Sequence, residues 1–202
     1  MSRKTPRPKE PLYDAPKDHA VLVTVPDAPF LAVEGHGSPY DPAFQGAIRA
    51  LYPIAYAIHF DVKKATGTSH PVPPLEALWW WGAGRSFPEE DEKEWRWRLM
   101  IRQPKGVTSA MLAKAKASVR AKHPEIAVDS VELQRYHEGR SMQILHVGPY
   151  KDEATTIQRL HEEIQKAGYH ASGLHHEIYL GDPRRAKPEK LRTLVRQPVE
   201  SG

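Results

Sequence analysis

The chain has 202 residues, with 29 lysines and arginines against 25 acidic residues, and therefore a formal net charge of +4. Its length suits one domain or two fused halves, and its apolar fraction of 40% is ordinary for a folded protein. The absence of cysteine excludes a disulfide framework, a thiolate zinc site and a cysteine nucleophile.

The first 18 residues form a basic, proline-rich leader. Residues 1–17 hold five basic and two acidic side chains, so they carry +3 of the net charge of +4. This composition favours an extended chain, and we expect residues 1–18 to be disordered. The remaining body is nearly neutral, so we expect no specific nucleic-acid partner, with a phosphate-contacting arm as the alternative. No run resembles a signal peptide or spans a bilayer, which favours a cytoplasmic protein without a membrane partner.

Residues 19–104 predict a hairpin, a helix and two strands. The strand-like runs AVLVTV and FLAVE flank the turn-forming sequence PDAP, a pattern typical of a hairpin. Apolar residues then recur at helical spacing from Phe44 to Ile58, and Pro53 is expected to kink this helix. The runs LEALWWW and WRWRLMI predict the two strands.

The rest of the chain predicts the same order after a linking helix. This Ala- and Lys-rich helix, at about 107–123, begins after a Thr108 N-cap and ends before Pro124. The runs SVELQRY and SMQILHV predict a second hairpin, and a helix capped by Asp152 follows. The runs LHHEIYL and LRTLVRQP predict the last two strands.

The two halves contain matching local sequences at matching positions. SPYD precedes the first predicted main helix and GPYKD the second, while LMIRQP and TLVRQP end the last strand of each half. We therefore predict an α+β fold made of a duplicated hairpin-helix-strand-strand unit, with pseudo-two-fold symmetry and a central ligand groove. A single domain at 19–199 would contain repeats at about 19–104 and 128–199, joined by the helix at about 107–123.

All five tryptophans lie between Trp79 and Trp97. Aromatic side chains in strands usually fill the core, but tryptophan also offers a broad face to planar or cationic ligands. Strand alternation places Trp79 and Trp81 on one face and Trp80 on the other, so at least one tryptophan points away from the core side. In the run WRWRLMI, Trp97 shares a face with Leu99. From this geometry we expect Trp80 and Trp97 to contact a ligand.

The run LHHEIYL carries a second candidate site. Alternation places His175, Glu177 and Tyr179 on one face and His176 on the other. A buried Glu177 needs a partner, and one that lines a cavity can bind a cation or act as a base. The alternative is an exposed glutamate on a half-solvated sheet. Since the adjacent histidines point to opposite faces, we expect no metal site. Nucleotide-binding, zinc-protease and serine-hydrolase motifs are absent from the sequence, so no cofactor is expected.

The runs HVGPYKDE, HHEIYLGDPRR and LRTLVRQPV, with LEALWWW and WRWRLMIRQP, resemble the stand-alone form of the GyrI-like small-molecule-binding family. The resemblance covers residues from about 19 to 199. It implies a duplicated βαββ module of the SHS2 type with a groove between the repeats. In related multidrug regulators, a glutamate in an aromatic groove attracts planar cationic drugs, and Glu177 occupies the matching position.

The tryptophan-rich strands are most similar to a subset of that family, the cyclopropanoid cyclopropyl hydrolases, which open the strained ring of DNA-alkylating natural products. This resemblance implies that the protein binds planar aromatic xenobiotics and hydrolyses such alkylators, which protects the cell. Glu177 and Tyr179 are then the expected catalytic residues. The expected ligand-binding residues are Trp80, Trp97, Tyr136 and Tyr150. The alternative is a non-catalytic protein that sequesters hydrophobic or cationic aromatic compounds, and in either case we expect a monomer or weak dimer.

Overall fold

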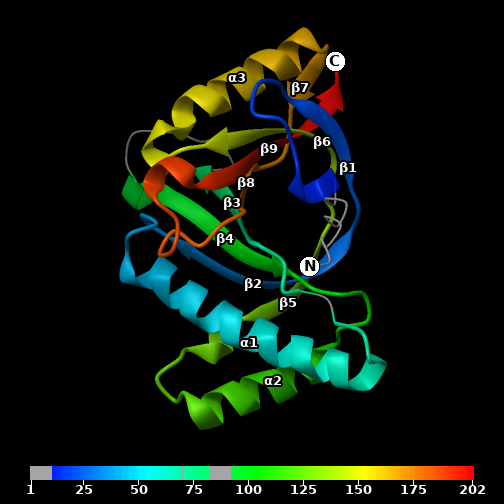
Figure 1. Ribbon diagram of the computed structural model, residues 1–202, viewed down its shortest axis with the longest axis vertical. Helices are drawn as coiled ribbons and strands as arrows, with labels where there is room; N and C mark the ends of the chain where they lie inside the picture. Colours follow the sequence, from blue (N-terminus) through cyan, green and yellow to red (C-terminus); the bar gives the residue numbers. More distant parts are fainter. Residues whose placement is uncertain (1–10, 70, 82–91) are drawn as a thin grey trace, which may run out of the picture.

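The computed structural model describes residues 11–69, 71–81 and 92–202, so residues 1–10 of the expected leader lie outside the described residues. The described residues form an α+β fold around one large antiparallel sheet, which confirms the predicted class. The α-helices among them are α1 (Pro42–Thr66), α2 (Ser109–Lys122) and α3 (Glu153–Lys166). In Figure 1, α3 lies against one end of the curved sheet, and α1 and α2 lie at the other.

The strands of this part of the chain follow an order that is far from sequential. In chain order they are β1 (Val21–Val25), β2 (Ala28–His36), β3 (Leu75–Trp81), β4 (Trp95–Arg102), β5 (Glu132–Tyr136), β6 (Gly139–Val147), β7 (Tyr169–Ala171), β8 (His175–Tyr179) and β9 (Arg192–Ser201). The order across the sheet is β1-β6-β9-β8-β3-β4-β2-β5, and β7 pairs with β9. Short 3₁₀ helices lie at η1 (Pro11–Tyr13), η2 (Glu92–Glu94), η3 (Val128–Ser130), η4 (Tyr150–Asp152) and η5 (Pro188–Lys190).

Both predicted hairpins are wrong. β1 pairs with β6 and not with β2, while β5 pairs with β2 and not with β6. A two-residue hairpin turn needs positive φ angles, and no non-glycine residue in the described part of the chain has one, those at 26–27 and 137–138 included. Each link therefore continues forward. Residues 21–36 and 132–147 form two long, bent segments that run antiparallel to each other.

The strand pairings follow the same pattern in both halves. Each of the first four strands has a counterpart later in the chain: β5 for β1, β6 for β2, β8 for β3 and β9 for β4. When every strand is replaced by its counterpart, the same pairs of neighbouring strands result. β3 and β8 pair with each other at the centre of the sheet, where Ala77 lies opposite Glu177. The centre is therefore the line along which the two halves meet.

The longest helix, α1, begins with Pro42, whose missing N–H is harmless in a first turn. It ends before Gly67, which has a φ of 70° and whose N–H bonds to the last turn. Pro53 lies inside α1, and the helix continues on both sides of it. The apolar stripe of α1 includes Phe44 and Ile58 and packs against β2, β3 and β4.

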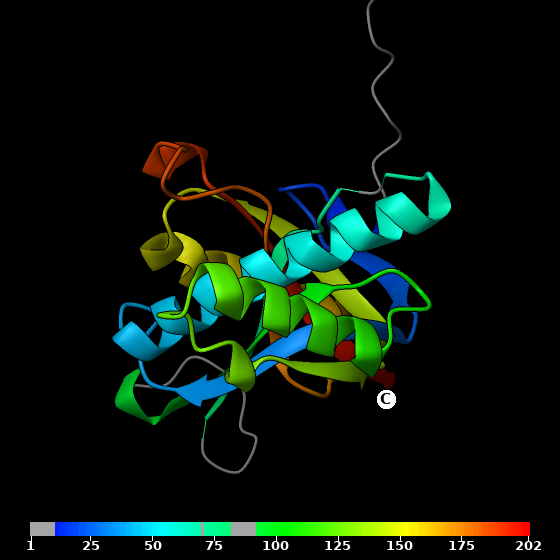
Figure 2. The ribbon, with the colours of Figure 1, turned by 90° about the horizontal axis from the view of Figure 1, so that it is seen from below.

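The helix α2 lies within the segment of the expected linking helix. The Thr108 side chain accepts a hydrogen bond from Met111 N, which caps its first turn. Lys114 of α2 pairs with Asp61 of α1 at 2.8 Å. Figure 2 shows α1 and α2 side by side, and α2 also contacts the edge strand β5 of the sheet.

The sheet has two faces, and the alternation predicted along β3 and β4 is correct. We call the face that packs against α1 and α3 the helix face, and the opposite one the inner face. Trp79 and Trp97 belong to the cluster on the helix face. Trp80 and Met100 belong to a separate cluster on the inner face. Each tryptophan therefore serves one face only.

Residues 11–18 differ from the expected disordered leader. η1 lies within the curve of the sheet, against its inner face (Figure 1). Gln143 Nε2 donates hydrogen bonds to the carbonyl oxygens of Pro11 and Asp14, and Ala15 is buried. Proline removes N–H donors but keeps its carbonyl acceptor, so a proline-rich segment suits a sheet face that supplies donors.

Candidate functional site

Glu177 is a charged residue within an otherwise apolar row that crosses the helix face. From β6 to β2, the paired residues of this row are Ile144, Val195, Glu177, Ala77, Leu99 and Val33. Glu177 is only 5% exposed and lies where the half covered by α1 meets the half covered by α3. A carboxylate buried in this way requires donors close by.

Neighbouring residues on the same face supply those donors. Tyr179 Oη donates to Glu177 Oε2 at 2.7 Å, and His175 Nε2 lies 3.2 Å from Glu177 Oε1. Trp79 Nε1 donates in turn to Tyr179 Oη at 3.3 Å. Burial would raise the pKa of Glu177, but its interactions with His175 and Tyr179 outweigh burial and lower the pKa. Glu177 is therefore ionised at neutral pH.

Glu153 brings a second carboxyl group to the same place. It is the first residue of α3, is 4% exposed, and lies close enough to Glu177 for the charge of Glu177 to act on it. Burial, followed by the charge of Glu177, raises the pKa of Glu153 to about 9. The site therefore holds one ionised and one protonated carboxyl group, so that one can accept a proton while the other donates one.

Aromatic rings surround this carboxyl pair. Trp79 stacks on Phe44 of α1, with ring centroids 5.5 Å apart and an interplanar angle of 15°. Trp95 meets Trp79 edge-on at 5.9 Å. Tyr150 of η4 meets Tyr179 edge-on at 5.7 Å. Rings from both halves of the molecule thus contribute to one site.

Three of the six residues predicted for the site come together in the structure. Glu177 and Tyr179 share a face of β8, as their spacing predicts, and share a hydrogen bond. Tyr150 reaches them from η4 and is half-buried. The aromatic and acidic parts of the candidate site are therefore adjacent.

The other three predicted residues lie elsewhere. Trp97 is on the helix face but is 1% exposed, and its ring packs edge-on against Phe44 at 5.2 Å, inside the core. Trp80 and Tyr136 belong to the inner-face cluster with Phe30. They lie across the sheet from Glu177 and cannot line the same site, because a sheet separates the side chains of its two faces.

The inner face of β8 carries a different buried network. His176 lies between two carboxylates, with its Nδ1 atom 2.8 Å from Glu138 Oε1 and its Nε2 atom 3.1 Å from Glu76 Oε2. Arg196 Nη1 donates to Glu138 Oε2 at 3.0 Å. Burial lowers the pKa of His176, but Glu138 and Glu76 outweigh burial and raise it to about 9. The two cations and two carboxylates balance each other.

This network also holds the N-terminal segment. Tyr13 Oη donates to Glu76 Oε1 at 2.9 Å, and the Arg196 guanidinium donates to the carbonyl oxygen of Leu12. Burial, followed by the charge of Glu76, raises the pKa of Tyr13. The phenol therefore remains a donor, and the inner-face network acts as an anchor for residues 11–14.

Sequence reasoning missed Glu153 and Trp79 as site residues. Glu153 stands at the start of a predicted helix, where an exposed acidic residue is common, so nothing local marks it as buried. Its one sequence signal is its place directly after the repeated motif GPYKD. Strand alternation places Trp79 and Trp80 on opposite faces of the sheet, but it does not show which of the two faces carries the site.

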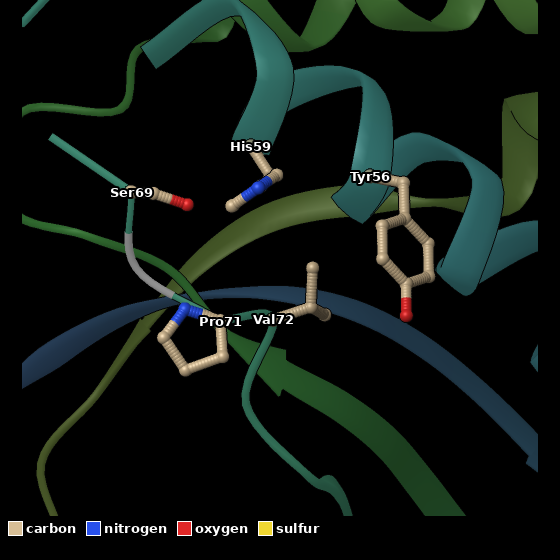
Figure 3. Close-up of a pocket in the computed structure, with 5 residues that line it drawn as sticks. All are labelled: Tyr56, His59, Ser69, Pro71 and Val72. Atoms are coloured by element: carbon tan, nitrogen blue, oxygen red, sulfur yellow. The ribbon is translucent and has the colours of Figure 1, made fainter. Parts of the chain in front are cut away.

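Two surface cavities lie away from the carboxyl pair. One, of about 410 Å³, is lined by Tyr56 and His59 of α1 and by Ser69, Pro71 and Val72, as Figure 3 shows. A neighbouring cavity of about 580 Å³ extends toward Tyr13 and Arg102. No described carboxylate lines either cavity, so neither offers the acid and base groups found around Glu177.

Within residues 11–69, 71–81 and 92–202, no group of three or more histidine, aspartate and glutamate side chains is arranged to hold a metal ion. Within the same residues, no helix has the length and apolar character required to cross a bilayer.

Comparisons with known proteins identify the family. The sequence profile described as "GyrI-like small molecule binding domain" matches residues 21–200. An uncharacterized conserved protein from Listeria innocua has 38% identity and a TM-score of 0.84, over 92% of this chain and 94% of that chain. A structure described as a hydrolase from Listeria innocua has 37% identity and a TM-score of 0.81, over 94% and 95%.

More distant structures agree with the fold alone. The C-terminal domain of EcmrR has 15% identity and a TM-score of 0.55, over 91% of this chain and 98% of that chain. Comparison with curated protein sequences gives no match. Since the family profile spans nearly the whole described sheet and its helices, the chain belongs to the GyrI-like small-molecule-binding domain family.

Proposed function

We propose that this protein binds planar aromatic xenobiotics at the Glu177 site and hydrolyses cyclopropanoid DNA-alkylating compounds. The observation that carries the proposal is the ionised Glu177 carboxylate, which His175 and Tyr179 hold in place among aromatic rings. An oriented carboxylate of this kind can position and deprotonate a water molecule. The family and the similar protein described as a hydrolase support the proposal.

The proposed reaction adds one water molecule to the strained ring. Glu177 accepts a proton as the water oxygen forms a bond to the cyclopropyl CH₂ carbon. The strained bond between that carbon and the spiro carbon breaks, and its electron pair enters the dienone ring. The dienone oxygen becomes a phenolate and takes up a proton, which gives a phenol. The product lacks the electrophilic carbon that alkylates DNA.

The aromatic residues have two tasks in this proposal. Trp79 and Trp95 would hold the flat ligand, and Tyr179 would keep Glu177 oriented. Because Glu177 is 5% exposed, the half-buried Tyr150 ring must rotate away to admit a ligand. Side-chain rotation of this kind is fast compared with typical turnover.

A second candidate function is sequestration of cationic aromatic compounds without turnover. The same observation favours it, since a buried anion between aromatic rings attracts a delocalised cation. In either case the proposal includes action in the cytoplasm as a monomer or weak dimer, which size-exclusion chromatography and fractionation of expressing cells test directly.

The deciding experiment follows ring opening of a cyclopropanoid alkylator by mass spectrometry with purified protein. We expect turnover above the buffer rate for the unmodified chain, and a loss of roughly 100-fold or more for Glu177→Gln, in line with removal of a general base. Glu162→Gln is the matched control, because Glu162 is an exposed residue on α3. Turnover no faster than buffer contradicts the enzymatic proposal. Loss of cation affinity alone in Glu177→Gln favours sequestration.

A further inference from the structure

The two buried carboxyl groups of the site share one proton. Glu153 and Glu177 are 4% and 5% exposed and lie close together, and two neighbouring buried carboxyl groups do not both ionise because their charges repel. Glu177 already accepts a hydrogen bond from Tyr179 Oη at 2.7 Å, and His175 Nε2 lies 3.2 Å from its other oxygen. Both interactions stabilise the Glu177 anion. Within the described part of the chain, Glu153 Oε1 is buried and has no hydrogen-bond partner. The proton therefore belongs to Glu153.

We propose that protonated Glu153 is a hydrogen-bond donor to the ligand, and that it selects neutral planar carbonyl compounds over planar cations at neutral pH. The inference rests on the proposed function, because it assumes that a ligand enters the Glu177 site. A carbonyl oxygen accepts the Glu153 proton without any change of charge. A cation gains most from the pair only after Glu153 has lost that proton.

The groups that face Glu153 fix the direction of this selection. Glu177 and Tyr179 face it from β8, Thr193 from β9 and Tyr150 from η4, while His175 contacts Glu177. Burial, followed by the charge of Glu177 and the hydrogen bond to it, raises the pKa of Tyr179, so this phenol stays neutral. His161 on α3 lies near His175, and burial lowers its pKa, so it adds no positive charge.

The same proton has a place in the proposed ring opening. The dienone oxygen gains negative charge as the strained bond breaks, and protonated Glu153 can transfer its proton to that oxygen. Glu177 has by then accepted the proton of water, so the pair still holds one proton and the product leaves as a phenol. No external acid is required, because the proton count of the two carboxyl groups is unchanged.

The test compares two probes of the same shape. N-methylacridone is neutral and has a carbonyl oxygen, whereas N-methylacridinium is a permanent cation on the same tricyclic frame. Quenching of tryptophan fluorescence gives the dissociation constant of each probe between about pH 7 and pH 9.5. If the cation needs ionised Glu153, its affinity rises by about tenfold per pH unit below the pKa of that group. The affinity of the neutral probe should change by no more than about twofold up to pH 9.

Glu153→Gln is the key variant, because glutamine can donate to a carbonyl oxygen but cannot ionise. We expect this variant to bind the neutral probe with unchanged affinity. Its affinity for the cation should no longer rise with pH. Glu162→Gln, on the same helix, should behave as the unmodified chain. The infrared band of a protonated carboxyl group should be present in the unmodified protein at neutral pH and missing from Glu153→Gln.

The outcomes separate this inference from the proposed function. If both probes bind with the same pH dependence, or if Glu153→Gln keeps the rise for the cation, the selection by Glu153 is wrong while the binding site stands. If neither probe binds, the proposed aromatic site itself is wrong. The titration uses the unmodified chain, so the result does not depend on how well the variant folds.

Discussion

The two faces of β8 both carry buried carboxyl groups, but these groups are neutralised in different ways. On the inner face, His176 and Arg196 meet Glu76 and Glu138, so two cations face two carboxylates. On the helix face, Glu177 has a protonated Glu153 beside it. All of these side chains are at least nine-tenths buried.

Under the proposed function, the inner-face network serves structure and the helix-face pair serves chemistry. In the inner-face network, the two cations pair with the two carboxylates. Glu76 and Arg196 also form hydrogen bonds with Tyr13 and Leu12, which hold residues 11–14 in place. On the helix face, Glu153 has a raised pKa and an unpartnered carboxyl oxygen among the described residues, which are features of a group that can exchange a proton. One strand can support both roles because alternate residues never share a face.

Arg196→Met should produce the largest effect. It leaves Glu138 buried with one partner fewer, and breaking a buried ion pair in this way costs about 3–5 kcal/mol. Urea unfolding measures the loss of unfolding free energy. Glu177→Gln is the comparison, and its unfolding free energy should change by less than about 1 kcal/mol because it removes charge from a crowded pair. Equal losses in both variants would contradict the division of roles.

Glu153→Gln should change how stability depends on pH. The pKa of Glu153 is raised to about 9, so the folded chain keeps this proton after the unfolded chain has lost it. Folded-state stability therefore falls as pH rises from the unfolded pKa to about 9, by about 1.4 kcal/mol per pH unit for one group. His176 adds a loss between about pH 6.5 and pH 9 in both proteins, because its pKa is raised from 6.5 to about 9.

The readout is the difference in unfolding free energy between Glu153→Gln and the unmodified chain at several pH values. We expect this difference to move in favour of the variant as pH rises above about 5. A constant difference would mean that Glu153 is ionised in the folded protein at neutral pH.

Tyr179→Phe should lower turnover by about 10–100-fold, corresponding to loss of a hydrogen bond to a charged group. The Tyr179 hydroxyl lowers the pKa of Glu177, so the acidic limb of the rate profile should shift to higher pH in the variant. A pH series of initial rates measures this shift. An unchanged limb would show that Tyr179 does not orient the base.

Tyr13→Phe should produce the smallest effect, a loss of about 1–2 kcal/mol of unfolding free energy, because it removes one donor from Glu76 and leaves His176 in place. Turnover should remain within about twofold of the unmodified chain, since Tyr13 lies on the inner face. A larger loss of turnover than of stability would show that the two faces are coupled.

The face of each strand residue could be predicted from sequence. The period of two along β3, β4 and β8 separates Trp79 from Trp80 and groups Glu177 with Tyr179, because backbone geometry alone decides that alternation. The class of fold and the position of the main helices follow from equally local signals.

The partner of each strand could not be predicted in the same way. The sequence PDAP suggests a turn, yet β1 and β2 pair with strands more than 100 residues away. Glu153 and Tyr136 show the same limit for site residues, since only tertiary packing buries the one beside Glu177 and places the other on the inner face. Non-local contacts leave no mark in a single sequence window.

The crossing of residues 21–36 with 132–147 has a consequence for how the chain folds. Each half of the sheet is completed by a strand from the other half, so neither repeat expressed alone contains a finished sheet. The contacts that close the sheet can form only after more than 100 residues have been brought together, and such contacts slow folding to the range of milliseconds to seconds. On the ribosome, the first half must therefore wait with open strand edges until the second half has been synthesised.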